Sequence, residues 1–91
     1  MNKRKGGKMK ILRRDDKLIE FDEPINNITE ELIDELSMKD LYLHGDIVSN
    51  NPRVIYIFDT AWQRVYWGYI GQKTFEREPD EEVEQELLNE Y

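Results

Sequence analysis

The sequence predicts an α+β fold: an antiparallel sheet of about five strands with one packed helix and an acidic C-terminal helix. Three observations support this prediction. Short apolar runs bounded by turn residues indicate strands, two other segments carry apolar residues at helical spacing, and 91 residues suffice for one hydrophobic core. The predicted order is β-β-α-β-β-β-α. We expect a single small domain over residues 10–91, preceded by a flexible basic leader over residues 1–9.

The first hairpin is predicted around Asp15-Asp16, which separates two short stretches of mixed apolar and charged residues. With this pair as a two-residue loop, Leu12 would face Ile19 across the hairpin. Pro24 would then end the second strand, because proline cannot donate a ladder hydrogen bond.

A helix is predicted over about residues 28–38. Asn27 and Glu30 have the spacing of a capping box, with Asn27 as the N-cap. The apolar residues after Asn27 recur at helical spacing: Ile28, Leu32, Ile33 and Leu36. This segment is therefore expected to pack one side against the sheet.

A third strand is predicted at Leu41–His44, with Gly45 as a bulge or bend before Ile47-Val48. The polar residues 49–52 then predict a turn. These signals place one short strand between the helix and the strongest hairpin of the sequence.

The clearest hairpin signal is a pair of apolar runs joined by a loop centred on Ala61-Trp62. This loop places Asp59 opposite Arg64 and Tyr56 opposite Trp67, so an opposite-charge pair and an aromatic pair support the register. One face of the hairpin is then rich in aromatic residues and the other in aliphatic ones. We expect the aliphatic face to pack on the central helix, and the aromatic face to be partly open or covered by the C-terminal segment.

The residue pattern of the C-terminal segment predicts a short amphipathic helix that begins at Pro79, because proline is favoured as the first helical residue. Val83, Leu87 and Tyr91 share one stripe at a spacing of four residues. The acidic residues at its start suit the helix dipole.

Charge is unevenly distributed along the chain, whose formal net charge is −7. Residues 1–17 hold eight basic and two acidic side chains, whereas the remainder holds five basic and eighteen acidic ones. The basic arm from Lys3 to Lys17 fits either a solvated tail or a nucleic-acid contact that neutralises phosphates. Residues 5–9 could also be encoded as a purine-rich ribosome-binding site before a start codon at Met9. Residues 1–8 would then be a translated leader, and the source a bacterium or its phage.

Several classes of function find no support in the sequence. The chain has no cysteine, so disulfides, cysteine-based zinc sites and thiol catalysis are excluded. His44 is the only histidine and no recognisable nucleophile accompanies it. We therefore predict no catalytic residue, no metal site and no cofactor. No apolar run approaches the roughly 18 residues of a membrane span, and we expect a cytoplasmic protein of a bacterium or a phage-infected cell.

Like charges four residues apart on the predicted helices are the most informative polar feature. Each such pair costs about 0.2 to 0.5 kcal/mol of helix stability. They fit either a solvated acidic face or an ordered surface that attracts a basic partner and imitates the phosphates of a nucleic acid. The candidate partner-binding acids on the central helix are Glu30, Glu31, Asp34 and Glu35.

Aromatic residues form the second candidate surface. Trp62 lies at a hairpin tip, from which its ring cannot easily reach the core, so we predict it as an interface anchor. Tyr56, Trp67 and Tyr69 on the aromatic sheet face fit either core packing or the same interface.

These signals predict a non-catalytic, acidic protein-binding module. Small acidic domains without cysteine are common among phage-encoded inhibitors, which makes inhibition of a host nucleic-acid-binding or defence protein by charge mimicry the more specific hypothesis. The alternative is a small nucleic-acid-binding protein that uses residues 3–17. A self-associating structural domain is a third possibility, and the sequence leaves the oligomeric state open.

Overall fold

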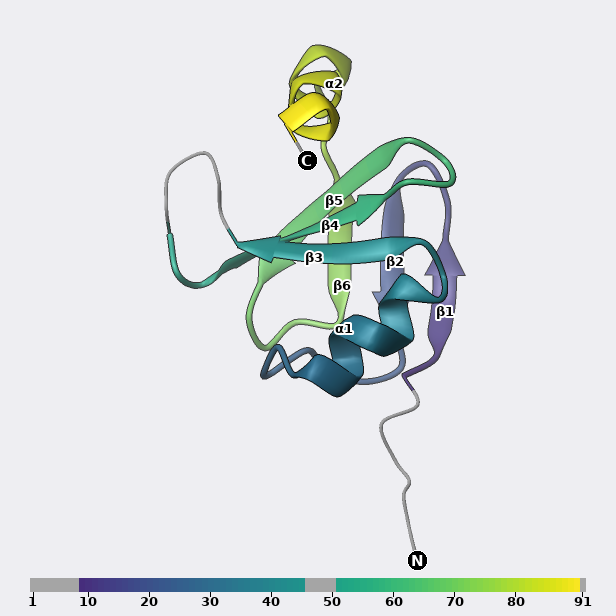
Figure 1. Ribbon diagram of the computed structural model, residues 1–91, viewed down its shortest axis with the longest axis vertical. Coiled ribbons are helices and arrows are strands. Elements are labelled where there is room, and N and C mark those ends of the chain that lie inside the picture. The colour runs from purple at the N-terminus through teal and green to yellow at the C-terminus, as the bar shows by residue number, and fades with distance from the viewer. Residues whose placement is uncertain (1–8, 46–50, 91) are drawn as a thin grey trace, which may run out of the picture.

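The computed structural model describes residues 9–45 and 51–90, which form a curled antiparallel sheet of six strands and two helices (Figure 1). In chain order the elements are β1 (Ile11–Arg14), β2 (Leu18–Phe21), α1 (Glu30–Ser37), β3 (Leu41–Gly45), β4 (Val54–Asp59), β5 (Arg64–Tyr69), β6 (Thr74–Arg77) and α2 (Glu81–Glu90). The α+β class, the antiparallel sheet and the acidic C-terminal helix are confirmed. The sheet has six strands, so the predicted number of about five is approximately right.

The strand that the sequence did not reveal is β6. It holds one fully buried apolar side chain, Phe75, among polar neighbours, so it has no hydrophobic periodicity to detect. β6 is nevertheless central, because it pairs with β2 on one side and with β5 on the other. A Cβ atom at Gly68 of β5 would lie 2.5 Å from the Phe75 ring, which explains the glycine in that strand.

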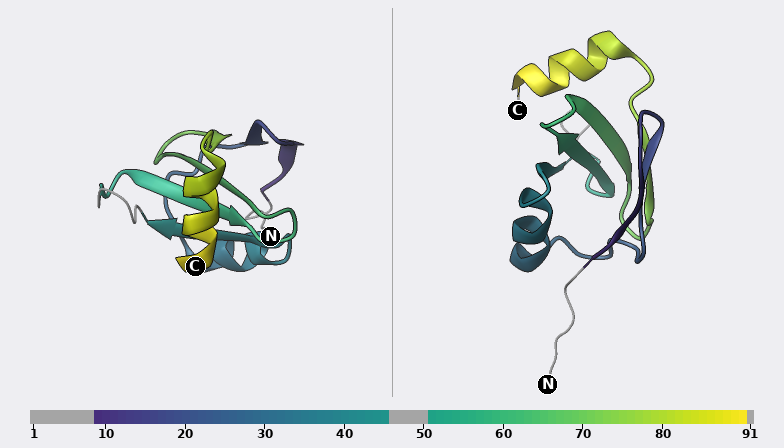
Figure 2. Two further views of the ribbon diagram at one scale, coloured as in Figure 1. Left: turned by 90° about the horizontal axis from the view of Figure 1, so that it is seen from above. Right: turned by 90° about the vertical axis from the view of Figure 1, so that its right-hand side faces the viewer.

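The sheet order β1-β2-β6-β5-β4-β3 makes β1 and β3 the two edges, and the sheet curls until these edges approach each other (Figure 2). An ion pair joins the edge strand β1 to β4, the neighbour of β3. Arg14 Nη2 of β1 lies 3.0 Å from Asp59 Oδ1 of β4, and it also donates to the carbonyl of Lys39 just before β3. Asp59 is fully buried, so its carboxylate depends on this partner.

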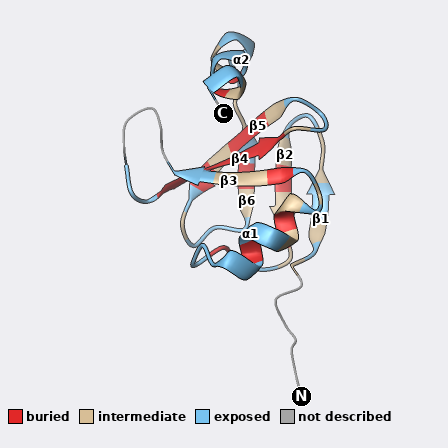
Figure 3. Cartoon of the chain, in the orientation of Figure 1, coloured by how far each residue is buried: buried red, intermediate tan, exposed pale blue. Residues whose placement is uncertain are grey.

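Two hydrophobic clusters occupy the two faces of the sheet. Figure 3 shows the buried residues, in red, mainly in the strands and at a few positions of the two helices. The cluster inside the curl joins α1 to the sheet and includes Leu32, Leu36, Ile55, Ile57 and Tyr66. The cluster on the opposite face joins α2 to the sheet and includes Tyr56, Phe58, Val65, Trp67 and Leu87. This confirms that the aliphatic face receives the central helix. Of the two alternatives for the aromatic face, the structure shows cover by the C-terminal segment.

The first hairpin has a different register from the predicted one. Arg14 pairs with Ile19, and a bulge at Leu12 shifts the register before Ile11 pairs with Phe21. Leu12 is therefore 60% exposed and does not face Ile19. The loop spans three residues because the Asp15 carboxylate accepts the backbone N–H groups of both Lys17 and Leu18, which an Asp-Asp two-residue turn does not provide.

The predicted register of the β4–β5 hairpin is confirmed: Asp59 pairs with Arg64 and Tyr56 with Trp67. Gln63 closes the loop in a left-handed conformation with φ of 57°. Of the predicted bulge or bend at Gly45, the bulge was wrong, because Gly45 pairs regularly with Ile55 at the end of β3. Residues 46–50, which include Ile47, Val48 and part of the predicted turn, lie outside the described residues.

Both helix starts also differ from the prediction. The N-cap of α1 is Thr29, whose Oγ1 accepts the N–H of Leu32, and not Asn27. α2 begins at Glu81, after Asp80 accepts the N–H groups of Glu82 and Val83. In both places a short polar side chain sits where it reaches the free N–H groups of the first turn. Tyr91, predicted as part of the apolar stripe, lies outside the described residues.

Candidate functional site

The four candidate acids of α1 separate into two pairs. Glu30 and Asp34 lie on the solvent side of the helix and are both exposed. Glu31 and Glu35 lie on one flank, beside a hollow of about 270 Å³ that the loop after β2 also lines. The helix therefore presents acids on two adjoining sides, while Leu32 and Leu36 face the core.

The hollow beside α1 combines carboxylates with an apolar floor. Its lining includes Glu23, Glu31 and Glu35 together with Ile25 and Leu32. One Glu35 oxygen, Oε2, accepts the backbone N–H of Met9 at 2.6 Å, whereas Oε1 is buried without a partner among the described residues. The lining thus contains three carboxylates, one of which has an oxygen without a donor among the described residues.

Most acids of the surface are not neutralised by neighbouring cations. Within residues 9–45 and 51–90 only three ion pairs form, and they use the carboxylates of Asp15, Asp59 and Glu84. None of the α1 acids takes part in one. An ordered helix with unpaired carboxylates produces a negative surface potential that attracts cations.

α2 carries a second acidic surface and one residue that sequence reasoning missed. Its exposed acids are Glu81, Glu82, Glu86 and Glu90. Glu84, in contrast, is only 3% exposed and faces the sheet. Glu84 follows Val83 directly and lies next to the apolar stripe of the helix. This position is the sequence signal that could have predicted its burial.

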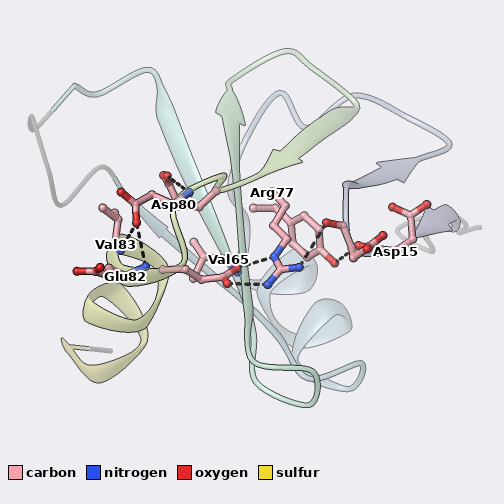
Figure 4. Close-up of polar contacts among 10 residues, drawn as sticks. Asp15, Val65, Arg77, Asp80, Glu82 and Val83 are labelled. Atoms are coloured by element: carbon pink, nitrogen blue, oxygen red, sulfur yellow. Dashed lines mark hydrogen bonds and ion pairs between the residues drawn. The ribbon is translucent and has the colours of Figure 1, made fainter.

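The Glu84 carboxylate holds α2 on the sheet through three hydrogen bonds. Its Oε2 accepts Val65 N–H at 2.7 Å and Arg77 Nε at 2.9 Å, and its Oε1 accepts Arg77 Nη2 at 2.8 Å (Figure 4). The bond to Glu84 raises the pKa of the Arg77 guanidinium above its usual value. We call Glu84, Arg77 and Val65 the α2 latch.

Trp62 lies on the β4–β5 loop and is 59% exposed. The Arg64 guanidinium carbon lies 4.7 Å from the centroid of its ring, which is a cation–π contact. The backbone N–H of Trp62 is fixed by the Asp59 carboxylate at 3.0 Å. Trp62 thus lies beside one cation, Arg64, and no described contact joins it to the acids of α1.

The three aromatic candidates of the sheet differ in exposure. Tyr56 is 7% exposed and, like the partly buried Trp67, belongs to the cluster beneath α2. Tyr69 is 43% exposed and meets the Trp67 ring edge-on at 6.1 Å. Of the three, only Tyr69 offers a partner a large free area while α2 is docked.

The described part of the basic arm is partly neutralised. Arg14 is bound to Asp59, and Arg13 Nε lies 2.6 Å from Asp15 Oδ2. The bond from Arg13, followed by the backbone N–H groups of Lys17 and Leu18, lowers the pKa of Asp15 to about 2. Lys10 and Lys17 remain exposed, and residues 3–8 lie outside the described residues.

The described residues hold no cluster of three or more metal-ligating side chains. His44 is exposed, and its Nδ1 lies 2.9 Å from the carbonyl oxygen of Gly45. Neither helix in the described ranges is long and apolar enough to cross a membrane. No protein-family model matches the sequence, and the searches of curated proteins and of solved structures found no significant similarity.

Proposed function

We propose that this protein is a non-catalytic protein-binding module whose acidic α1 surface binds a basic partner. One observation carries the proposal: Glu30, Glu31 and Asp34 are held on a capped, packed helix and stay exposed, without an ion pair among the described residues. Fixed carboxylates steer a cationic partner and keep their spacing on contact, which mobile acids on a tail cannot do.

The hollow beside α1 supports a partner that presents lysine or arginine side chains. Its carboxylates, Glu31 and Glu35, would face the cationic head, and its floor, Ile25 and Leu32, would contact the aliphatic stem. Inhibition of a host nucleic-acid-binding or defence protein by charge mimicry, as in phage-type inhibitors, is the more specific form of this proposal. It rests on the resemblance between ordered carboxylates and regularly spaced phosphates.

Charge reversal on α1 tests the proposal. Immobilised wild-type chain should capture basic proteins from a bacterial lysate, and capture should weaken as salt is raised. Glu31→Lys with Asp34→Lys should reduce capture at least about tenfold, equivalent to about 1.4 kcal/mol. Glu86→Lys with Glu90→Lys makes the same charge change on α2 and is the matched control. Equal capture by both double variants would reject α1 as the binding surface.

Trp62 is proposed as a second contact of the same interface. An exposed tryptophan stacked on Arg64 is rigid and amphipathic, which are properties of interface anchors. Trp62→Ala should weaken capture of the partner without changing the thermal unfolding midpoint, and Trp62→Phe should retain most of it. Unchanged capture by Trp62→Ala would remove this residue from the interface.

The alternative is nucleic-acid binding through residues 3–17, favoured by the eight basic side chains of residues 1–17. Deleting all of residues 1–17 is not a clean test, because it would remove β1 and the Arg14–Asp59 ion pair. Replacing Lys3, Arg4, Lys5 and Lys8 by glutamine changes only positions outside the described residues. Binding to single- or double-stranded DNA or RNA at low salt that these replacements abolish would support the alternative.

A further inference from the structure

The connection between the sheet and α2 is short and contains a proline. β6 ends at Arg77 and α2 begins at Glu81, so only residues 78–80 join them. The connection is ordered: Glu78 N–H donates to the Val65 carbonyl at 2.8 Å, and Asp80 N–H donates to the Glu78 carboxylate at 3.1 Å. Proline at position 79 restricts the conformations by which the chain can fold back.

The surface beneath α2 is specific in shape and charge. We call it the α2 seat and define it as Tyr42, Tyr56, Phe58, Val65, Trp67 and Arg77, which contact the helix or belong to its cluster. β6 ends at Arg77, before it could supply a strand carbonyl to the Val65 N–H of β5. The Glu84 carboxylate accepts this N–H instead. The seat therefore recognises an apolar helix face with one carboxylate at a fixed position.

Neither the seat nor the helix is stable without the other. An empty seat would expose the now fully buried side chains of Phe58 and Val65. α2 has ten residues, with repelling carboxylates at Glu82, Glu86 and Glu90, and isolated helices shorter than about 12 residues are marginal in water. The seat is therefore filled by an α2 helix, either from its own chain or from another.

We propose that α2 exchanges between two copies of this chain, so that α2 of one copy occupies the seat of the other. Every contact between α2 and the seat, including the α2 latch, is preserved in the exchanged dimer. Only residues 78–80 change, from a folded-back to an extended connection, and a three-residue connection that contains proline leaves the chain few ways to fold back. Figure 2 shows α2 at one end of the molecule, with the connection as the segment of chain that leads to it from the sheet.

Net charge sets the conditions for exchange. Each copy carries a formal charge of −7, so two copies repel one another at low salt. The exchanged dimer should therefore increase with protein concentration and with salt. Capture of a basic partner has the opposite salt dependence, so the two associations can be distinguished.

Refolding of the full chain at several protein and salt concentrations is the first test, with the mass measured by light scattering. We expect a species with twice the 11.0 kDa mass of the chain, increasing with concentration and salt. Insertion of four Gly/Ser residues between Glu78 and Pro79 should leave only monomer, because a longer connection folds back more easily. Monomer alone under all conditions, or a dimer unaffected by the insertion, would overturn the proposal.

Complementation between two variants tests which helix fills which seat. Arg77→Glu and Glu84→Arg each place like charges in the α2 latch, so neither should dock α2 on its own chain. Co-refolded in equal amounts, the two variants restore opposite charges only between chains, and a heterodimer of twice the chain mass should form. A variant that does not fold alone is still tested in the mixture. A mixture that stays at the monomer mass would contradict exchange.

Discussion

The two helices are both short, amphipathic and acidic, yet they are held on the sheet by different interactions. α1 docks inside the curl through buried leucines and a threonine cap, with no ion pair to the sheet among the described residues. α2 docks on the opposite face through Leu87 and a buried carboxylate, Glu84, which pairs with Arg77. Glu30, Glu31 and Asp34 of α1 are thus exposed and take no part in docking, and Glu35 contributes one hydrogen bond, to Met9 N–H, whereas Glu84 of α2 is buried in an ion pair.

Removal of apolar contact from α1 is expected to have the largest effect on stability. Leu36 is fully buried, and Leu36→Ala should cost about 3 kcal/mol of unfolding free energy through lost burial and the cavity left behind. Ile33, on the same helix, is 42% exposed, so Ile33→Ala is the matched control and should cost less than about 1 kcal/mol. Chemical denaturation measures both. Similar losses would mean that α1 is docked differently.

The α2 latch gives the next largest effect. Glu84→Ala leaves the Arg77 guanidinium and Val65 N–H without their acceptor, and we expect a loss of about 2 kcal/mol, reduced by the partial exposure of Arg77. Glu86→Ala removes an exposed acid of the same helix and relieves two like-charge contacts, so it should be neutral or slightly stabilising. Hydrogen exchange of α2 reports both changes. A neutral Glu84→Ala would refute the structural role of the latch.

Capping of α1 gives a smaller effect and tests the corrected helix start. Thr29→Ala removes the acceptor of Leu32 N–H and should destabilise the protein by about 1 kcal/mol. Asn27→Ala should have almost no effect, because Asn27 is exposed and precedes the cap. Thermal unfolding midpoints compare the two. The reverse order of effects would restore Asn27 as the cap.

The smallest effect on stability is expected from the loop between β1 and β2. Arg77 of the α2 latch also donates to the carbonyl of Asp16 in this loop. Folding lowers the pKa of Asp15 to about 2, mainly through Arg13. Its stabilising contribution is thus present above the unfolded pKa of about 4 and is lost as pH falls through about 2. Asp15→Asn should lie below wild type at neutral pH and converge with it on acidification. A stability difference that persists below pH 2 would contradict this assignment.

The sequence predicted local structure best where the pattern was strong. Apolar residues fill both faces of the β4–β5 hairpin, so a shift by one residue would break the Tyr56–Trp67 and Asp59–Arg64 pairs, and the register was correct. The β1–β2 hairpin mixes charged and apolar residues, and there the Asp15 hydrogen bonds decided the loop. β6 escaped prediction because Phe75 is its only buried residue.

By itself the sequence determined the α+β class, the two amphipathic helices and the packing of the central helix on the aliphatic face, because these follow from hydrophobic periodicity. Only the tertiary structure decided which charges are structural. Arg14 and Asp59, forty-five positions apart, meet because the sheet curls, and Glu84 meets Arg77 because α2 folds back over β5. Periodicity describes which side of an element is buried, whereas the partner of a buried charge depends on how distant elements approach one another.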